Sequence, residues 1–335
     1  MKARRAEIKI QYKGVNITKD LMPYLLNFSY TDNESKADEI QVDLQDKEAK
    51  WHGPWLPNKD DEIIAAINVF NWDKPGDNRV LNCGKFFVDE VDYKGPPDTF
   101  TIKAISYPVK AGGKDTKRTK AWSSAKLSVV CADLATSAGL GFIFDGKDVF
   151  LDRVEQVQQT DLSFAKELNR KYGNSIKVQD GNLVVYNEKK YESSPAIKKI
   201  VKTGGKVLNY SFKEQMHDAG YKEIEVKYYD SEKKKVVAHV YNVPGVEIGT
   251  KYTVNERAKS LADAEEIAIA TARKKNKKIL TADITVVGDP SFLQGYTVDI
   301  VGWQKFDGKY FIENASHGVG NGYTVKLKLR GVLPY

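Results

Sequence analysis

The sequence predicts a mainly β protein with an α+β insert, in which two related small β-barrel domains flank a middle α+β domain. Three observations predict this class. Short runs of alternating apolar and polar residues fill both ends of the chain, helical spacing of apolar residues appears after a glycine- and lysine-rich stretch, and one strand-pair motif occurs twice. We place the domains at residues 1–110 (N-terminal β-barrel), 111–200 (middle α+β) and 201–335 (C-terminal β-barrel).

Composition narrows the class of protein. A chain of 335 residues is long enough for two or three domains with cores of their own. Its 29% charged and 41% hydrophobic residues are ordinary for a globular protein, and 52 basic against 45 acidic residues leave a net charge of +7, too balanced for a dedicated nucleic-acid binder. No apolar run approaches the roughly 18 residues of a membrane span, so we expect neither a span nor an export signal.

The first domain is predicted to consist of short strands. Residues 39–45 alternate apolar and polar side chains, which is typical of a half-buried antiparallel strand. Residues 12–15 indicate a tight hairpin tip. Residues 86–91 and 100–105 predict two further strands, joined through the Gly-Pro-Pro at 95–97.

The middle domain is predicted to contain two helices and a hairpin after a linker at residues 110–115. The first helix has Ser124 as its expected N-cap, Gly139 at its end, and a buried stripe of Leu127, Val130, Cys131, Leu134 and Ala138. A second helix should begin at Thr160 or Asp161, bury Phe164, Leu168 and Tyr172, and end at Gly173. Residues 176–185 predict a hairpin that turns at Asp180-Gly181.

In the last domain, residues 223–228 and 236–241 predict two strands paired across a charged tip at 230–233. One helix follows, with Ser260 and Asp263 resembling a capping box and Leu261, Ala264, Ala268 and Ala272 on its expected buried face. The basic cluster at 273–278 is interpreted as solvated charge that complements the helix C-terminus, in preference to a nucleic-acid site.

An internal repeat is the most informative pattern. Residues 84–89 (Gly-Lys-Phe-Phe-Val-Asp) match residues 308–313 (Gly-Lys-Tyr-Phe-Ile-Glu). Residues 100–103 (Phe-Thr-Ile-Lys) match residues 323–326 (Tyr-Thr-Val-Lys), sixteen and fifteen positions after the respective first glycines. A hairpin with a turn glycine is a common pattern, but equal order and near-equal spacing favour two duplicated β-domains that should superpose.

Motifs for chemistry are missing from the sequence. His52, His217, His239 and His317 are scattered without metal-ligand spacing, and Cys83 and Cys131 form no CxxC pair. The carboxylate pairs Asp60-Asp61 and Asp89-Glu90 would point to opposite faces of a strand, and the Gly-Gly-Lys runs at 112–114 and 204–206 lack the spacing of a phosphate loop. We therefore predict no enzyme activity, no catalytic residue, no cofactor-binding residue, no metal site and no cofactor.

Longer motifs resemble phage late-control-D proteins, the baseplate tail hub family. Residues 156–168, followed by Tyr172-Gly173 and residues 178–185, resemble the middle domain of that family. The segments that resemble its closing β-domain are Gly288-Asp289-Pro290, Leu293-Gln294-Gly295, Val298, Gly302, residues 307–312, His317 and residues 327–329. Residues 37–43 with Trp51 and Trp55 resemble the opening domain of prophage-type hubs from Gram-positive hosts.

The resemblance implies a structural hub of a contractile or related tail, or of a tail-derived bacteriocin particle. Such a hub is a homotrimer in the baseplate that joins the hexameric tail tube to the trimeric central spike, and it is assembled in the bacterial cytoplasm. Other baseplate proteins and the tape measure are further partners. Two β-barrels in each of three chains would make six similar lobes, which suits docking to a hexameric tube.

Some alternatives stay open at this point. Lys103 and Lys326, at equivalent repeat positions, could face either the lumen of the ring or a neighbouring protomer. The chain ends soon after the second β-domain, so we expect spike and wall-degrading activities on separate chains. A tail-associated peptidoglycan hydrolase is disfavoured by the missing acid/base pair, and a nucleic-acid-binding protein is supported only by the net charge and the lysine clusters, so nucleic acid is not expected as a specific ligand.

Overall fold

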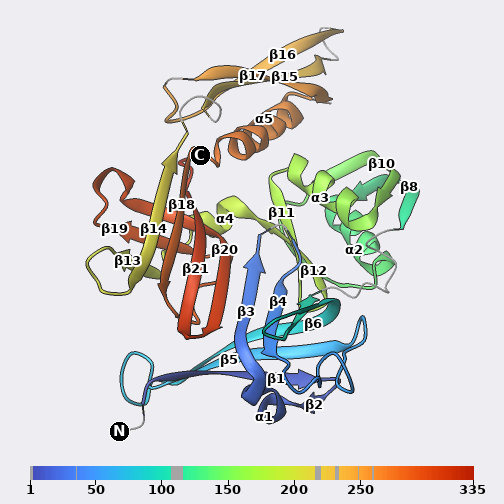
Figure 1. Ribbon diagram of the computed structural model, residues 1–335. Coiled ribbons are helices and arrows are strands. Elements are labelled where there is room, and N and C mark those ends of the chain that lie inside the picture. Colours follow the sequence, from blue (N-terminus) through green and yellow to red (C-terminus); the bar gives the residue numbers. More distant parts are fainter. Residues whose placement is uncertain are drawn as a thin grey trace.

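The computed structural model describes residues 3–34, 36–106, 116–215, 220–230, 234–247, 249–258 and 260–335. The linker expected at 110–115 lies wholly within residues 107–115, outside the described part. His217 and residues 231–233 of the charged tip also lie outside it. The predicted class, mainly β with an α+β insert, is confirmed. Figure 1 shows the strands of the two chain ends side by side, with the middle segment packed to one side of them and a helix-backed sheet above.

The first β-unit is an antiparallel arrangement in the order β2-β1-β5-β6-β7-β4-β3. Its elements are β1 (Arg5–Tyr12), β2 (Val15–Asn16), α1 (Thr18–Leu21), the 3-10 helix Met22–Tyr24, β3 (Leu25–Asn33), β4 (Glu39–Gln45), β5 (Glu62–Phe70), β6 (Arg79–Lys94) and β7 (Thr99–Ile105). The expected strand at 39–45 is β4, with Ile40, Val42 and Leu44 buried. The tip between β1 and β2 turns at Lys13 and Gly14, whose φ angles of 49° and 79° suit a two-residue hairpin turn.

The second β-unit has the order β13-β19-β20-β21-β18-β14. Its elements are β13 (Lys198–Val201), β14 (Val207–Glu214), β18 (Leu280–Val287), β19 (Thr297–Val301), the 3-10 helix Gln304–Phe306, β20 (Gly308–Gly320) and β21 (Gly322–Gly331). β20 also pairs with β3, so both units belong to one sheet of 13 strands. Their buried apolar side chains form one shared cluster.

The middle segment packs two helices against short strands. Its elements are β8 (Lys117–Lys126), α2 (Leu127–Ser137), β9 (Gly141–Asp145), β10 (Phe150–Thr160), α3 (Asp161–Lys171), β11 (Asn174–Gln179), β12 (Asn182–Asn187) and α4 (Glu188–Ser193). The expected stripe of α2 is buried, and β11 pairs with β12 across Asp180 and Gly181. The Thr160 hydroxyl accepts a hydrogen bond from the Ser163 N–H, so the predicted start of α3 is confirmed.

The predicted N-cap of α2 is wrong. Ser124 lies inside β8, and α2 follows directly after Lys126, which pairs with Phe150. The loop before β10 takes over the capping: the Val149 carbonyl accepts from Leu127 N–H, and the Asp148 carboxylate accepts from Ser128 N–H at 3.0 Å. Val149 and Asp148, which are distant in sequence, therefore accept hydrogen bonds from the first N–H groups of α2, the groups that a local N-cap side chain would otherwise bind.

A three-stranded sheet backed by one helix interrupts the second β-unit between β14 and β18. It contains β15 (Tyr221–Asp230), β16 (Lys235–Asn242), β17 (Thr250–Ala258) and α5 (Leu261–Asn276), with its own apolar cluster. The expected pairing of β15 with β16 and the cap of α5 by Ser260 are confirmed. Leu261 stands in the first turn of α5 and is 51% exposed, so the prediction that it lies on the buried face was wrong. Ala264, Ala268 and Ala272 are buried, as predicted. The domain boundaries at residues 110 and 200 stay a prediction.

Candidate assembly interface

The two β-units have the same strand order. Taken along the chain, the strands β1, β3, β4, β5, β6 and β7 of the first unit correspond to β13, β14, β18, β19, β20 and β21 of the second. Each strand has corresponding neighbours, as the order β1-β5-β6-β7-β4-β3 repeats in β13-β19-β20-β21-β18-β14. One pairing differs in direction, since β1 is antiparallel to β5 and β13 is parallel to β19.

Irregularities in the strands confirm the correspondence. The register of β6 shifts at Asp89 and that of β20 shifts at Glu313, which are the sixth residues of the two repeat motifs. Bulges are specific features of a strand and do not recur at matching places by chance. In the two cores, Tyr30 meets Phe86 edge-on at 6.0 Å and 71°, and Phe212 meets Tyr310 at 6.3 Å and 68°.

The second half of the repeat is offset by two residues from its sequence match. Beyond the two bulges, Lys103 pairs with Glu90, and Lys328 pairs with Asn314. Lys103 therefore corresponds to Lys328, and its predicted equivalence to Lys326 was wrong. The hairpin of β20 and β21 extends two residues further before it turns than the hairpin of β6 and β7. Because side chains alternate with period two, Lys103 and Lys328 still lie on the face away from the core, as does Lys326.

Sequence reasoning missed a further repeated segment. Residues 25–33 (Leu-Leu-Asn-Phe-Ser-Tyr-Thr-Asp-Asn) match residues 207–215 (Val-Leu-Asn-Tyr-Ser-Phe-Lys-Glu-Gln). They form β3 and β14, and both strands shift register at their second residue, Leu26 or Leu208. The shared pattern Leu-Asn-aromatic-Ser-aromatic was the available signal, and the inserted β15–β17 and α5 conceal it by changing the spacing to the next strand.

The two units join edge to edge through β3 and β20. Six antiparallel pairs run from Asn33 with Asn314 to Phe28 with Val319. On the polar face, Thr31 Oγ1 lies 3.0 Å from Ser316 Oγ. On the core face, the rings of Tyr30 and His317 stack at 5.9 Å with an interplanar angle of 23°. A backbone ladder with matched side-chain pairs on both faces therefore connects one unit to the other.

Buried charges from the middle segment stabilise this junction. Lys177 on β11 places its Nζ 2.6 Å from Asp32 and 3.8 Å from Asp38, and all three side chains are buried. Asp32 also accepts the Gln294 N–H at 2.9 Å. Burial raises the pKa of Asp38 to about 7. Lys177 lowers this pKa, but its effect does not cancel that of burial, and the nearby Asp32 raises the pKa further.

His317 is a structural residue at the same junction. Its Nδ1 lies 2.7 Å from the Tyr323 hydroxyl, and its Nε2 lies 2.8 Å from the Phe292 carbonyl, to which it donates. Burial lowers the pKa of His317 to about 4, so the ring is neutral at pH 7.

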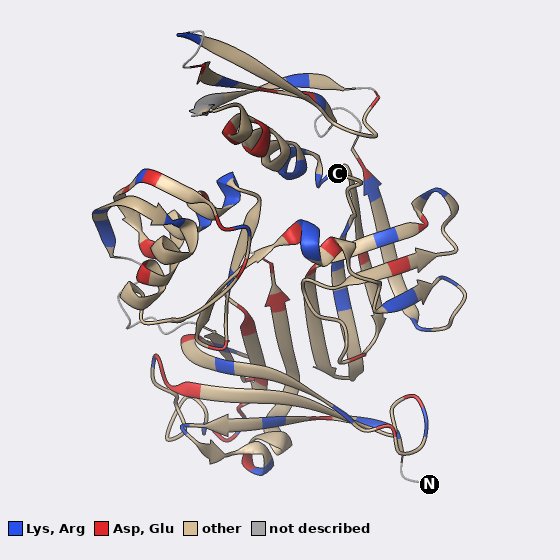
Figure 2. Cartoon of the chain, turned by 180° about the vertical axis from the view of Figure 1, so that it is seen from behind, with Lys and Arg blue, Asp and Glu red and all other residues tan. Residues whose placement is uncertain are grey.

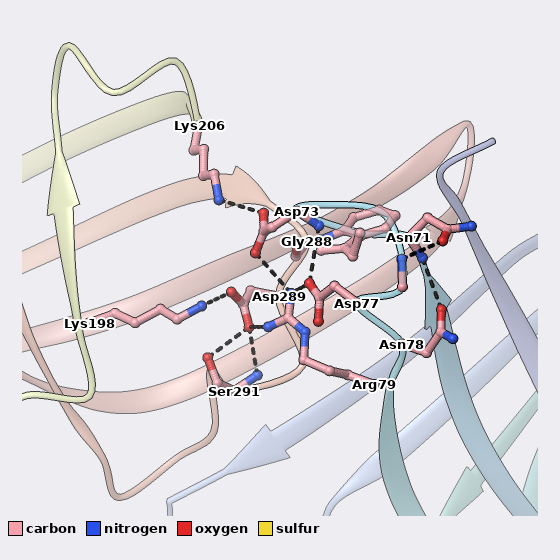
Figure 3. A network of polar contacts seen from close by, with 12 residues as sticks. Asn71, Asp73, Asp77, Asn78, Arg79, Lys198, Lys206, Gly288, Asp289 and Ser291 are labelled. Atoms are coloured by element: carbon pink, nitrogen blue, oxygen red, sulfur yellow. Dashed lines mark hydrogen bonds and ion pairs between the residues drawn. The ribbon is translucent and has the colours of Figure 1, made fainter. Parts of the chain in front are cut away.

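A second polar contact connects the units at the loop between β5 and β6 (Figure 3). Asp289 accepts from Arg79 Nη1 at 3.0 Å and forms an ion pair with Lys198. Lys206 reaches Asp73 in the loop at 2.7 Å. Burial of Asp289 would raise its pKa, but the contacts with Lys198 and Ser291 prevail and hold it below its ordinary value, so the carboxylate stays charged.

A third network joins β21, α4 and α5 around Arg330. Arg330 is fully buried, with Nη2 at 2.8 Å from Glu188 and 2.6 Å from Glu192. At the end of α5, Arg273 lies 2.6 Å from Glu192 and Lys277 lies 3.5 Å from Glu188. These two members of the basic cluster at 273–278 bind the buried Glu192 and the partly buried Glu188, so the interpretation of that cluster as solvated charge was wrong for them.

The residues weighed for catalysis have structural contacts or are buried. Asp61 accepts from the Tyr12 hydroxyl and pairs with Lys13, contacts that outweigh its burial and lower its pKa to about 2, while Glu90 pairs with Lys103 at 2.8 Å. Cys83 and Cys131 are buried, and burial raises the pKa of both thiols. Among the described residues no group of three His, Cys, Asp or Glu side chains could hold a metal ion.

Surface charge is mixed. Figure 2 shows Lys and Arg interspersed with Asp and Glu along the chain seen from behind. No helix within the described ranges is long and apolar enough to span a bilayer.

Comparison with known proteins gives relatives in sequence. The chain is 26% identical over 172 residues to the probable baseplate hub protein of Escherichia phage 186, and 27% identical over 175 residues to that of Escherichia phage P2. Each match spans 50% of this chain and 42% of the relative. No family model matches the chain. The resemblance to phage tail hub proteins, drawn above from motifs, is confirmed by these relatives.

Solved structures share the whole fold. A tail protein from Neisseria meningitidis superposes with a TM-score of 0.72 at 12% identity, covering 98% of both chains. The 43 kDa tail protein of prophage MuSo2 from Shewanella oneidensis gives 0.73 at 13% identity, covering 97% of this chain and 98% of that one. An Escherichia coli component of the type VI secretion system gives 0.57 at 10% identity, covering 98% of this chain and 77% of that one. The chain thus has the fold of phage tail proteins.

Proposed function

We propose that this chain is the structural baseplate hub of a phage-like tail, a homotrimer that joins the hexameric tail tube to the trimeric central spike. The observation that carries the proposal is the duplicated six-strand unit, with one strand order in both copies and an edge-to-edge junction between them. The sequence similarity to two probable baseplate hub proteins and the shared fold of phage tail proteins support it.

Duplication suits an adaptor between different symmetries. Three chains with two similar units each present six similar surfaces in one ring, and a hexameric tube needs six equivalent docking surfaces. The same ring keeps threefold symmetry through the middle segment and the sheet of β15–β17, which occur once in each chain. A spike with threefold symmetry can dock to those parts.

The surface of the sheet that faces away from the core is suited to the lumen of such a ring. Polar side chains alternate there with the buried ones, as Ser29 and Thr31 do on β3 and as Thr101 and Lys103 do on β7. The hub would act by binding and positioning other tail proteins. These would include other baseplate proteins and the tape measure. Its place would be the baseplate of a virion or tail-like particle assembled in the cytoplasm.

Labelling of the particle tests the proposal. A tagged copy of the chain is expressed in the bacterium that makes the particle, and purified tails are marked with gold against the tag. We expect label at one end of the tube, where the spike is attached. Label along the tube or on a head, or tails that assemble fully in a strain without the gene, would contradict a hub.

A further inference from the structure

Among the described strands, β6 and β14 each have an edge that lacks the partner that its counterpart has. Residues 314–319 of β20 pair with β3. The corresponding residues are 90–94 at the end of β6 and Gly95 after it, and they pair with no described strand on that side. Likewise β3 pairs on both edges, whereas β14 pairs only with β18 among the described strands. The two open edges are the two halves of a junction that the chain makes once internally.

Both open edges carry exposed apolar side chains. Val91 and Tyr93 on β6 are 40% and 47% exposed, and Tyr210 on β14 is 43% exposed. Their counterparts at the internal junction, Ala315, His317 and Phe28, are buried. Proteins normally cover or blunt an open, apolar strand edge because it binds other strands.

We propose that β6 of one copy pairs with β14 of a second copy, antiparallel and in the register of the junction between β20 and β3. That register places Tyr93 opposite Phe212 of the second copy and Asp92 opposite Lys213 of the second copy. The partner is thus another copy of this chain, and the proposal deepens the hub function, on which it rests for the closure of copies into a ring.

The side chains fit this register on both faces of the sheet. Tyr93 and Phe212 form an aromatic pair at the position where His317 and Tyr30 stack internally. Asp92 and Lys213 have opposite charges at the position where Ser316 and Thr31 lie within hydrogen-bond distance. Facing aromatic rings and opposite charges both stabilise antiparallel strands.

Each copy contributes one β6 edge and one β14 edge, so the contact is head to tail and forms a ring when the rotation closes. In a trimer, three junctions within chains alternate with three junctions between chains. The open edge of β6 and the open edge of β14 then both have a partner, so neither is left exposed in the ring.

Disulfide trapping tests the register directly. Directly opposed residues of antiparallel strands have Cα atoms about 4.5–5.5 Å apart, within the range that a disulfide bridges. A chain carrying Asp92→Cys and Lys213→Cys should give disulfide-linked dimers and trimers on a non-reducing gel after mild oxidation. The native Cys83 and Cys131 are buried, so they should not contribute.

Two matched controls use the same chain. Thr31→Cys with Ser316→Cys occupies the same register position in the internal junction, so it should form a disulfide within one chain only. Val91→Cys with Lys213→Cys is one residue out of register, which places the two thiols on opposite faces of the sheet, and no link should form. In a separate pair of variants, Asp92→Lys should reduce the trimer measured by light scattering, and adding Lys213→Asp should restore it.

The outcomes separate this inference from the hub function. A trimer that fails to cross-link through residues 92 and 213, or that links equally through 91 and 213, overturns the register and leaves the hub function standing. A protein that stays monomeric and uncross-linked at high concentration overturns the proposed contact itself. A ring that cross-links as expected but is not found at the tail tip supports the contact and contradicts the hub.

Discussion

Replacing Arg330 by methionine should strongly destabilise the protein. Arg330 is fully buried, and its guanidinium lies over the Phe311 ring at 4.4 Å while it contacts Glu188 and Glu192. Methionine keeps most of the apolar volume but takes a guanidinium partner away from the buried Glu192 and the partly buried Glu188. Breaking a buried ion pair from one side typically costs about 3–5 kcal/mol, because the remaining charge is desolvated and unpaired.

The neighbouring cations reduce this cost. Lys277 lies 3.5 Å from Glu188 and Arg273 lies 2.6 Å from Glu192, so each carboxylate keeps one partner. We therefore expect the lower end of the range, about 3 kcal/mol in the free energy of unfolding, measured by urea titration with tryptophan fluorescence.

Two further variants make the experiment decisive. Adding Glu192→Gln to Arg330→Met removes one of the uncompensated charges, so it should recover part of the loss. Arg153→Met is the matched control, because Arg153 pairs with Glu155 at the surface, where an ion pair contributes little. A loss for Arg330→Met no larger than that of the control would refute the reasoning that α4, α5 and β21 are held together by this arginine.

Three other results are expected. Leu134 is 2% exposed in the core of the middle segment, so Leu134→Ala should lower the free energy of unfolding by about 2–5 kcal/mol, and an unchanged melting temperature would place Leu134 outside the core. The pKa of His317 falls from 6.5 to about 4 on folding. This shift contributes about 3 kcal/mol to the free energy of unfolding above pH 6.5, and the contribution is lost as the pH falls toward 4. The destabilisation by His317→Asn should therefore shrink by that amount between pH 7 and 4 in urea titrations, and an equal loss at both pH values would contradict the assignment. The purified protein should not clear a peptidoglycan gel or bind metal stoichiometrically; clearing that one Asp or Glu substitution abolishes would overturn the non-enzymatic function.

Local patterns predicted much of the secondary structure because they depend on near neighbours. The alternation in residues 39–45, the helix start at Thr160 or Asp161 and the cap at Ser260 depend on contacts within a few positions, and all three predictions were confirmed. The predicted cap at Ser124 was wrong, because Asp148 from a distant loop accepts the hydrogen bond from an N–H group in the first turn of α2.

The repeat predicted the duplication but not its register. Side chains in strands repeat every two residues, so a match displaced by two positions keeps the same faces and looks equally good in sequence. The pairs that join the parts were beyond sequence reasoning, since Lys177 and Asp32 stand 145 positions apart and no local pattern connects them. The open edges of β6 and β14 became visible only when each strand could be compared with its counterpart.

The most direct test of the hub function is electron cryomicroscopy of the intact tail tip at side-chain resolution. We predict three copies of this chain in one ring between the tube and the spike, with their two β-units alternating as six similar lobes around the axis. A ring of another symmetry, two β-units that do not superpose, or density for this chain away from the tube and spike junction would contradict it.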